Sequence, residues 1–323
     1  MPRTPALSAA LALTGLLALS ACGSQSESAS SADADALSVA ASFYPLQYVA
    51  EQVGGDRVSV SNLTKPGAEP HDLELAPQDV ATLTDADLAL YLEGFQPAVD
   101  DAVTTSGVTA LDVSSAADLS LTYVEDHEHE EGEEHAHEEG EEHSHEEGEE
   151  VTDPHFWLDP MRLADVADEV AAELSSVDPD GASEYEANAA ALRTQLETLD
   201  STYDDGLAQC DSRLLVTSHT AFGYLADAYD LEQVGLTGLT PEAEPSPQDL
   251  AEVTDFVREN DVSTIFYETL VSPDIAETVA SATGARTDVL DPIEGLSDTS
   301  QGDDYQQIME SNLANLQEGL SCR

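Results

Sequence analysis

The segment from Leu37 to Leu63, LSVAASFYPLQYVAEQVGGDRVSVSNL, decides the fold because it predicts a strand, a helix and a second strand. Ser38 to Ser42 is a short β run, and Tyr44 to Val53 can form a helix that ends at the Gly-Gly-Asp sequence of residues 54–56. Residues Val58 to Leu63 then alternate between apolar and polar side chains, as strands do. A unit of this kind places its two strands parallel in one sheet.

The same alternation of strands and helices continues along the chain. Further strands are predicted at residues 88–92, 108–113, 214–217, 233–236, 263–267 and 286–290. This pattern is typical of parallel sheets with helices on both faces. We therefore predict an α/β fold of two similar lobes, each with a central parallel sheet.

A long helix is predicted between the two halves. Its apolar residues recur at intervals of four and three and form one stripe over about seven turns: Tyr185, Ala189, Leu192, Leu196, Leu199, Tyr203 and Leu207. We expect this helix to act as a rigid backbone strut. It divides the chain into a first lobe at residues 37–180, a linking helix at 181–209 and a second lobe at 210–323.

The charge balance excludes several classes of protein. The formal net charge is -58, from 67 acidic and 9 basic residues, which argues against binding to nucleic acid or to an anionic lipid surface. Lys65 is the only lysine and precedes a proline, so the chain has no G-x-x-x-x-G-K-[ST] phosphate-binding loop.

The first residues predict export and lipid anchoring. Arg3 precedes an apolar run from Ala6 to Leu19 that is too short to span a bilayer. The run ends in Leu-Ser-Ala-Cys-Gly, which resembles a bacterial lipobox, so we expect a signal peptide at 1–22 ending at a lipidated Cys22. Residues 23–36 would form a flexible tether, and the protein would be extracytoplasmic and anchored to the membrane. Ordinary signal cleavage with an incidental cysteine is the alternative.

The other two cysteines, Cys210 and Cys322, form a candidate disulfide. Disulfides persist in exported proteins, and the even remainder suggests a pair. Two free thiols are the alternative. Neither cysteine lies in a C-x-x-C sequence that would indicate a metal ligand.

A repetitive insertion lies in the first half. Residues 127–150 contain three copies of the octapeptide H-x-H-E-E-G-E-E, and the surrounding 125–150 segment is predicted to be disordered because it cannot form a core. Its histidines form a candidate auxiliary metal site: His127, His129, His135, His137, His143 and His145. A solvated acidic loop that keeps the protein soluble is the alternative.

The three remaining histidines lie in predicted loops. His155 belongs to Asp153–Pro160, a stretch with two flanking prolines that predicts a fixed, extended turn. His71 and His219 lie in loops after predicted strands, and Asp291 follows another. Ligands of α/β proteins bind beyond the carboxyl ends of the strands, so these four residues are candidates for one metal site in the cleft between the lobes. An ordinary hydrogen-bonding role for each histidine remains the alternative.

Five segments together resemble the zinc/manganese solute-binding lipoproteins of ABC importers. They are Ser42–Leu46, Gly67–Asp72, Pro154–Pro160, Ser218–Tyr224 and Leu290–Pro292. The resemblance implies two α/β lobes joined by a backbone helix, with His71, His155, His219 and Asp291 as metal ligands. The carboxylate is the least secure of the four, with Glu69, Glu268 or water as alternatives.

The resemblance implies a monomeric receptor that captures Zn²⁺ and delivers it to a separate membrane permease. Three imidazoles and a carboxylate suit zinc better than manganese, although Cu²⁺, Ni²⁺ and Co²⁺ are not excluded. A closed set of four protein ligands favours binding over catalysis, because an enzyme keeps one position open to water. The alternatives are a secreted zinc-dependent hydrolase with Glu69 or Glu268 as general base, and a surface metal buffer or adhesin.

Overall fold

The computed structural model describes residues 36–125, 149–241 and 245–323, which belong to one compact unit. The predicted signal peptide, Cys22, nearly all of the tether and the six repeat histidines lie outside the described residues. Among the helices of the described residues, none has the length and apolar character needed to span a bilayer.

The first half contains a four-stranded parallel sheet with strand order β2-β1-β3-β4. Its strands are β1 (Leu37–Ala41), β2 (Val58–Asn62), β3 (Leu88–Tyr91) and β4 (Ala110–Asp112). The helices of this half are α1 (Tyr44–Gly54), the 3₁₀ turn η1 (Gly55–Arg57), α2 (Pro77–Asp85), α3 (Pro97–Ser106) and α4 (Ser114–Ala117). The predicted strand–helix–strand unit is thus present, with β1 and β2 paired in parallel as expected.

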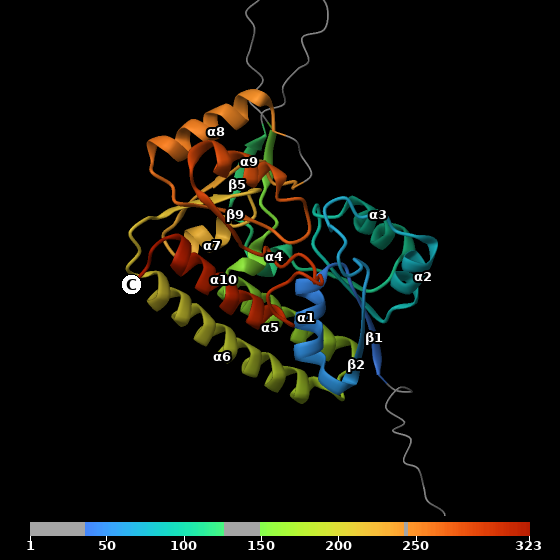
Figure 1. Cartoon of the computed structure of the whole chain (residues 1–323). Coiled ribbons are helices and arrows are strands. Elements are labelled where there is room, and N and C mark those ends of the chain that lie inside the picture. The colour runs from blue at the N-terminus through green and yellow to red at the C-terminus, as the bar shows by residue number, and fades with distance from the viewer. Residues whose placement is uncertain (1–35, 126–148, 242–244) are drawn as a thin grey trace, which may run out of the picture. The chain divides into compact units, whose positions relative to one another are not determined.

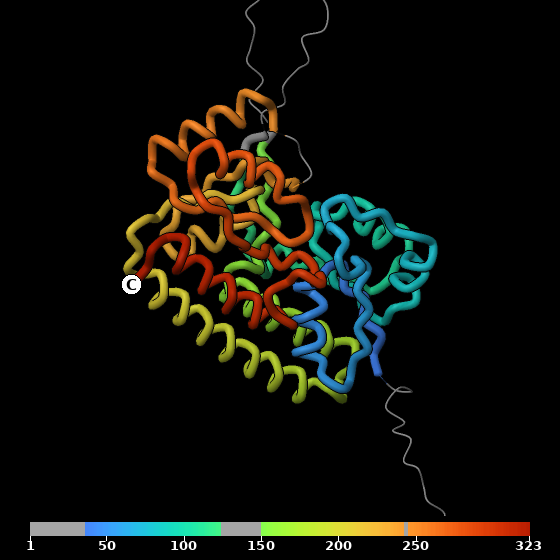
Figure 2. Tube along the Cα trace, viewed as in Figure 1, coloured from blue at the N-terminus to red at the C-terminus, as the bar shows by residue number. Residues whose placement is uncertain are grey.

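The second half contains another four-stranded parallel sheet, with strand order β10-β9-β7-β8. Its strands are β7 (Leu214–Thr217), β8 (Glu232–Gly235), β9 (Thr264–Tyr267) and β10 (Arg286–Val289). Its helices are α7 (Gly223–Ala228), α8 (Pro247–Glu259), α9 (Asp274–Thr283) and α10 (Tyr305–Gly319). The predicted α/β class with two parallel sheets is confirmed. Figure 2 traces the chain from the first half in blue and teal to the second half in yellow, orange and red.

Two helices connect the halves. They are α5 (Pro160–Val177) and α6 (Ala182–Leu207), which pack against each other, and α6 also contacts α10 (Figure 1). The buried residues of α6 are the seven of the predicted apolar stripe. The long connecting helix is therefore confirmed, and its apolar face is buried as the periodicity requires.

One hydrophobic core runs through both halves. It includes Val39 and Leu90 of the first sheet, Leu215 and Phe266 of the second, and the stripe of α6. Smaller clusters cover the other face of each sheet, which is why the central strands are buried on both sides. The halves are therefore joined by packing as well as by covalent linkers.

An antiparallel hairpin flanks the repetitive insertion. Strand β5 (Thr122–Glu125) pairs with β6 (Glu149–Thr152), so the ends of the predicted disordered segment at 125–150 are β structure. This corrects the predicted boundaries. The prediction considered only whether side chains could form a core. Strand pairing uses backbone hydrogen bonds, which glutamates can also make.

A disulfide joins Cys210, just after α6, to Cys322 at the end of the chain, as predicted. It closes a loop with a sequence separation of 112 residues. In the chain-entropy account, a closed loop of this size restricts the unfolded chain strongly.

We expect replacement of both cysteines by serine to lower the free energy of unfolding by about 2–5 kcal/mol. Denaturant titration of the variant and of the wild type would measure the loss. The wild type in reductant is the control and should match the variant. Equal stability of all three samples would contradict the prediction.

Candidate metal centre

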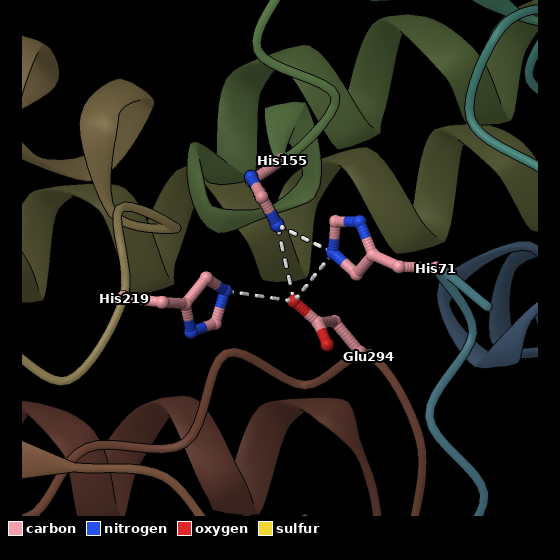
Figure 3. A group of neighbouring side chains, drawn as sticks. All are labelled: His71, His155, His219 and Glu294. Atoms are coloured by element: carbon pink, nitrogen blue, oxygen red, sulfur yellow. Dashed lines mark hydrogen bonds and ion pairs between the residues drawn. The ribbon is translucent and has the colours of Figure 1, made fainter. Parts of the chain in front are cut away.

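Four side chains converge in the centre of the described residues: His71, His155, His219 and Glu294 (Figure 3). Their potential ligand atoms all lie within 4.8 Å of one another. Glu294 Oε1 lies 3.0 Å from His155 Nε2, 3.3 Å from His219 Nε2 and 3.5 Å from His71 Nε2. The Nε2 atoms of His71 and His155 are 3.3 Å apart.

Each side chain comes from a loop, and three of the loops follow a strand of one of the parallel sheets. His71 lies between β2 and α2, His219 lies just beyond β7, and Glu294 follows β10. His155 lies between β6 and η2 (Phe156–Leu158), which is a 3₁₀ turn and not the extended turn that the sequence predicts. Carboxyl ends of parallel strands lie at one edge of a sheet, which explains how residues so far apart in sequence meet.

Asp153 orients His155. Its Oδ1 accepts hydrogen bonds from the backbone N–H of His155 at 2.9 Å and from Nδ1 of the ring at 2.7 Å. An ionised carboxylate can only accept, so Nδ1 carries the proton and the Nε2 lone pair faces the other three side chains. Asp153 and His155 are both fully buried, so water does not compete for this bond.

Glu268 orients His219 in the same way. Its Oε1 lies 2.6 Å from His219 Nδ1 and 3.1 Å from the hydroxyl of Ser218, which donates to it. Glu268, an alternative ligand in the sequence analysis, therefore contacts the rear of the imidazole. Carboxylates that hold the second nitrogen of a metal-binding histidine fix its tautomer and raise its basicity.

His71 is the most exposed of the four, with 10% of its side chain accessible. Its backbone N–H donates to Glu69 Oε1 at 3.0 Å, and its ring meets Phe95 edge to face. Glu69 Oε1 lies 4.0 Å from His71 Nε2, farther than Glu294. His71 also lines a pocket of about 460 Å³, which offers a way in from solvent.

The acidic residue that the structure brings to the histidines is Glu294, whereas the sequence analysis expected Asp291. Asp291 Oδ1 accepts from the backbone N–H of Ile293 at 2.8 Å, and Oδ2 accepts from the Thr269 hydroxyl at 3.0 Å. Both carboxylate oxygens of Asp291 therefore accept hydrogen bonds from other groups of the protein. Ile293 has a φ of 58°, and this left-handed residue stands between Asp291 and Glu294 in the turn. The sequence signal that could have indicated Glu294 is its position three residues after Asp291 and directly before Gly295, in the same turn.

Electrostatics couple the four side chains. Burial alone lowers the pKa of His155, but hydrogen bonds with Asp153 and Glu294 outweigh it and raise the pKa above its usual value. The same opposition, with Glu268 as main partner, raises the pKa of His219 to about 10. Burial raises the pKa of Glu294, but its hydrogen bonds with the three imidazoles hold it well below the ordinary range. Burial raises the pKa of Asp291 to about 6.

The geometry fits a small tetrahedral cation. With Nδ1–H held by a carboxylate, the Nε2 atoms of His155 and His219 present lone pairs to a carboxylate oxygen, an arrangement that needs a proton or a metal ion between them. Bonds of about 2.0–2.1 Å in a tetrahedron imply ligand–ligand separations of about 3.3–3.4 Å. The four separations given above between these atoms, 3.0, 3.3, 3.3 and 3.5 Å, bracket that value.

Comparison with known proteins defines the class to which such a fold and site belong. The family model described as "Zinc-uptake complex component A periplasmic" matches residues 39–319. The chain belongs to this family, the ZnuA family, and the resemblance stated from the sequence is confirmed.

Individual relatives agree with this assignment. The chain is 35% identical over 311 residues to the high-affinity zinc uptake system protein ZnuA of Bacillus subtilis, covering 94% of each chain. It is 36% identical over 288 residues to the zinc-binding lipoprotein AdcA of Streptococcus pneumoniae, covering 87% of this chain and 55% of AdcA. The chain thus spans about half the length of AdcA.

Solved structures extend the comparison to the fold. The laminin-binding protein Lmb of Streptococcus agalactiae, described as having adhesin and metal-transporting activity, superposes with a TM-score of 0.74 at 33% identity. The Zn(II)-bound ZnuA-like domain of Streptococcus pneumoniae AdcA superposes with a TM-score of 0.70 at 34% identity. Each comparison covers 88% of this chain and 99% of the other.

Proposed function

We propose that this protein is an extracytoplasmic receptor that captures one Zn²⁺ ion with His71, His155, His219 and Glu294 and delivers it to the permease of an ABC importer. The observation that carries the proposal is the convergence of three imidazole Nε2 atoms on one carboxylate oxygen, at tetrahedral separations. Membership of the zinc-uptake family supports delivery to a transporter rather than storage.

The site is suited to binding rather than to catalysis. Four protein ligands complete a tetrahedral zinc shell, whereas catalytic zinc sites reserve one position for water. In the hydrolase alternative Glu268 would act as a general base, but its Oε1 is held by His219 Nδ1. All four ligands come from one chain, so we expect the monomer to bind zinc.

Zinc would approach through the pocket that His71 lines. Asp72, Glu93 and Glu150 also line this pocket, and Glu150 belongs to strand β6 of the hairpin that flanks the repeats. Carboxylates at a pocket mouth attract divalent cations over long range. We propose that the repeat histidines collect zinc loosely and that the buried site binds it tightly.

Lipid anchoring at Cys22 is part of the proposal. The relative from Streptococcus pneumoniae is named a zinc-binding lipoprotein, which supports the lipobox interpretation. A lipid at Cys22 would hold the receptor beside its permease, with residues 23–36 as the tether.

We expect His155→Ala to weaken zinc binding at least about 100-fold, because it removes one of four ligands from a buried site. The measurement is competition with a chromophoric zinc chelator. The six repeat histidines should be changed to alanine in every sample, so that only the buried site is counted. Glu259→Gln, which changes an exposed acid at the end of α8 that does not line the pocket, is the matched control and should keep an affinity close to that of the parent.

The parent with alanines at the repeats should bind one zinc ion per chain by elemental analysis. Loss of tight binding in this parent would contradict the proposed division between loose and tight sites. Unchanged affinity in His155→Ala would contradict the proposed ligand set.

Zinc binding should release protons at neutral pH. The pKa of His219 is raised to about 10 and that of His155 is raised too, so imidazoles of the metal-free site hold protons that zinc must displace. Apparent affinity should therefore fall as pH falls from 9 to 6, on the order of tenfold per pH unit for each proton released. Calorimetry in buffers of different ionisation enthalpy would count the protons, and a count of zero at pH 7 would contradict the prediction.

Changing Cys22 to serine should shift the protein from the membrane fraction to the soluble extracytoplasmic fraction, because the lipid attachment point is lost. Immunoblotting of the fractions would measure the shift. Zinc affinity of the released protein should be unchanged. Retention in the membrane would argue against lipidation at Cys22.

A further inference from the structure

We infer that the turn from Asp291 to Leu296 is a prearranged support for Glu294, with Asp291 and Trp157 as positioning residues. This inference rests on the proposed zinc site and deepens it. It assigns roles to two buried side chains outside the group of four ligands. Asp291 belongs to the turn, and Trp157 is hydrogen-bonded to it.

The turn adopts an unfavourable backbone conformation immediately before Glu294. Ile293 has a φ of 58°, in the left-handed region that β-branched residues rarely occupy. Its side chain is fully buried in the main core. Such conformations persist only where the surrounding structure enforces them, and they gather at functional sites.

Hydrogen bonds from the second half enforce the first part of the turn. Asp291 Oδ1 accepts from the Ile293 N–H at 2.8 Å, and Thr269 donates to Oδ2 at 3.0 Å. Asn312 of α10 binds both backbone groups of Asp291: Oδ1 accepts from its N–H at 2.9 Å, and Nδ2 donates to its carbonyl at 2.7 Å. The Asp291 side chain thus holds the N–H of the left-handed Ile293, and Asn312 holds the backbone of Asp291.

Two hydrogen bonds from the first half flank Glu294. The indole N–H of Trp157 donates to the carbonyl of Pro292 at 2.7 Å, and the backbone N–H of Gly67 donates to the carbonyl of Leu296 at 2.8 Å. Trp157 lies two residues after His155, and Gly67 belongs to the loop of His71. The segments of two imidazole ligands are therefore fastened to the turn of the carboxylate ligand, two residues before and two residues after Glu294.

This arrangement couples the relative position of the halves to the metal shell. A displacement that broke the bonds from Trp157 and Gly67 would free the turn before and after Glu294. Glu294 would then lose its enforced position, and the zinc shell would lose its only anionic side chain among the four ligands.

Substitutions at Asp291 separate a positioning role from a ligand role. Asparagine keeps an oxygen that can accept from the Ile293 N–H, whereas alanine removes it. A positioning residue should therefore tolerate Asp291→Asn, while a ligand whose charge binds zinc should not. Asp298→Ala, at an exposed acid in the following loop, is the matched control for the change in net charge.

The experiment uses the full chain with the six repeat histidines changed to alanine. Chelator competition should show zinc binding about 10–100-fold weaker in Asp291→Ala. Asp291→Asn should bind zinc within about threefold of the parent, and Asp298→Ala should match it. An equal loss in Asp291→Asn and Asp291→Ala, or parent-like binding by Asp291→Ala, would overturn the inference.

Visible absorption of bound Co²⁺ gives a readout that a general loss of stability would not change. Four-coordinate Co²⁺ absorbs strongly, and the bands weaken when loss of Glu294 lets water molecules raise the coordination number to five or six. Asp291→Ala should give the weakened spectrum of Glu294→Ala, whereas Asp291→Asn should give that of the parent. A strong four-coordinate spectrum from Asp291→Ala would count against the inference.

Trp157→Phe tests the same support without altering Asp291. It keeps an aromatic ring in the core and removes the N–H that reaches Pro292. Weaker zinc binding with a weakened Co²⁺ spectrum is expected, and parent-like values for both would overturn the role of Trp157. If Asp291→Ala fails to fold, Thr269→Val, which removes one donor to Asp291, replaces it with the same expected direction.

The variants His155→Ala and Glu294→Ala test the zinc site itself, independently of the positioning inference. If both keep tight binding, the proposed ligand set fails. If both lose it while the Asp291 and Trp157 variants do not, only the positioning inference fails.

Discussion

The structure depends on one electrostatic constraint, the meeting of three imidazole lone pairs and a carboxylate oxygen in a buried space. Polar groups removed from water without partners cost several kcal/mol, so such a cluster needs a cation or protons at its centre. Asp153 and Glu268 make the constraint stricter, because they hold the Nδ1 protons of His155 and His219 and direct the Nε2 atoms inward. The parallel sheets, the shared core and α6 hold these loops close enough for the cluster to form.

Much of the scaffold could be predicted from the sequence because its signals are local and periodic. The stripe on α6 repeats at helical spacing, and the strand–helix–strand pattern around α1 follows from turn chemistry and alternation. The grouping of the three histidines could be predicted for a different reason. Histidine is rare outside the repeats, and each of the three lies in a loop, where a side chain is free to turn towards a common point.

Other parts of the site could not be predicted, because tertiary contacts decide them. Asp291 lies two residues after β10 and was predicted as the fourth ligand, yet Glu294, which follows the left-handed Ile293, is the residue that joins the cluster. No local rule places an isoleucine in that conformation, since its burial and the hydrogen bonds around it supply the reason. Glu268 lies 49 residues from His219, and only the pairing of β7 with β9 brings the two together.

The proposed receptor must bind its ion tightly and still release it, and the shared core limits how it can do so. Wide separation of the halves would expose apolar residues that lie in one continuous cluster, at a cost of about 25 cal/mol for each Å². Metal–ligand bonds are short and depend steeply on distance and angle, so a small shift is enough to weaken the shell. His71 and His155 come from the first half and His219 and Glu294 from the second. A slight displacement between the halves would therefore divide the four proposed ligands two against two, and in the proposed function this opens a path for zinc past His71 while most of the core stays closed.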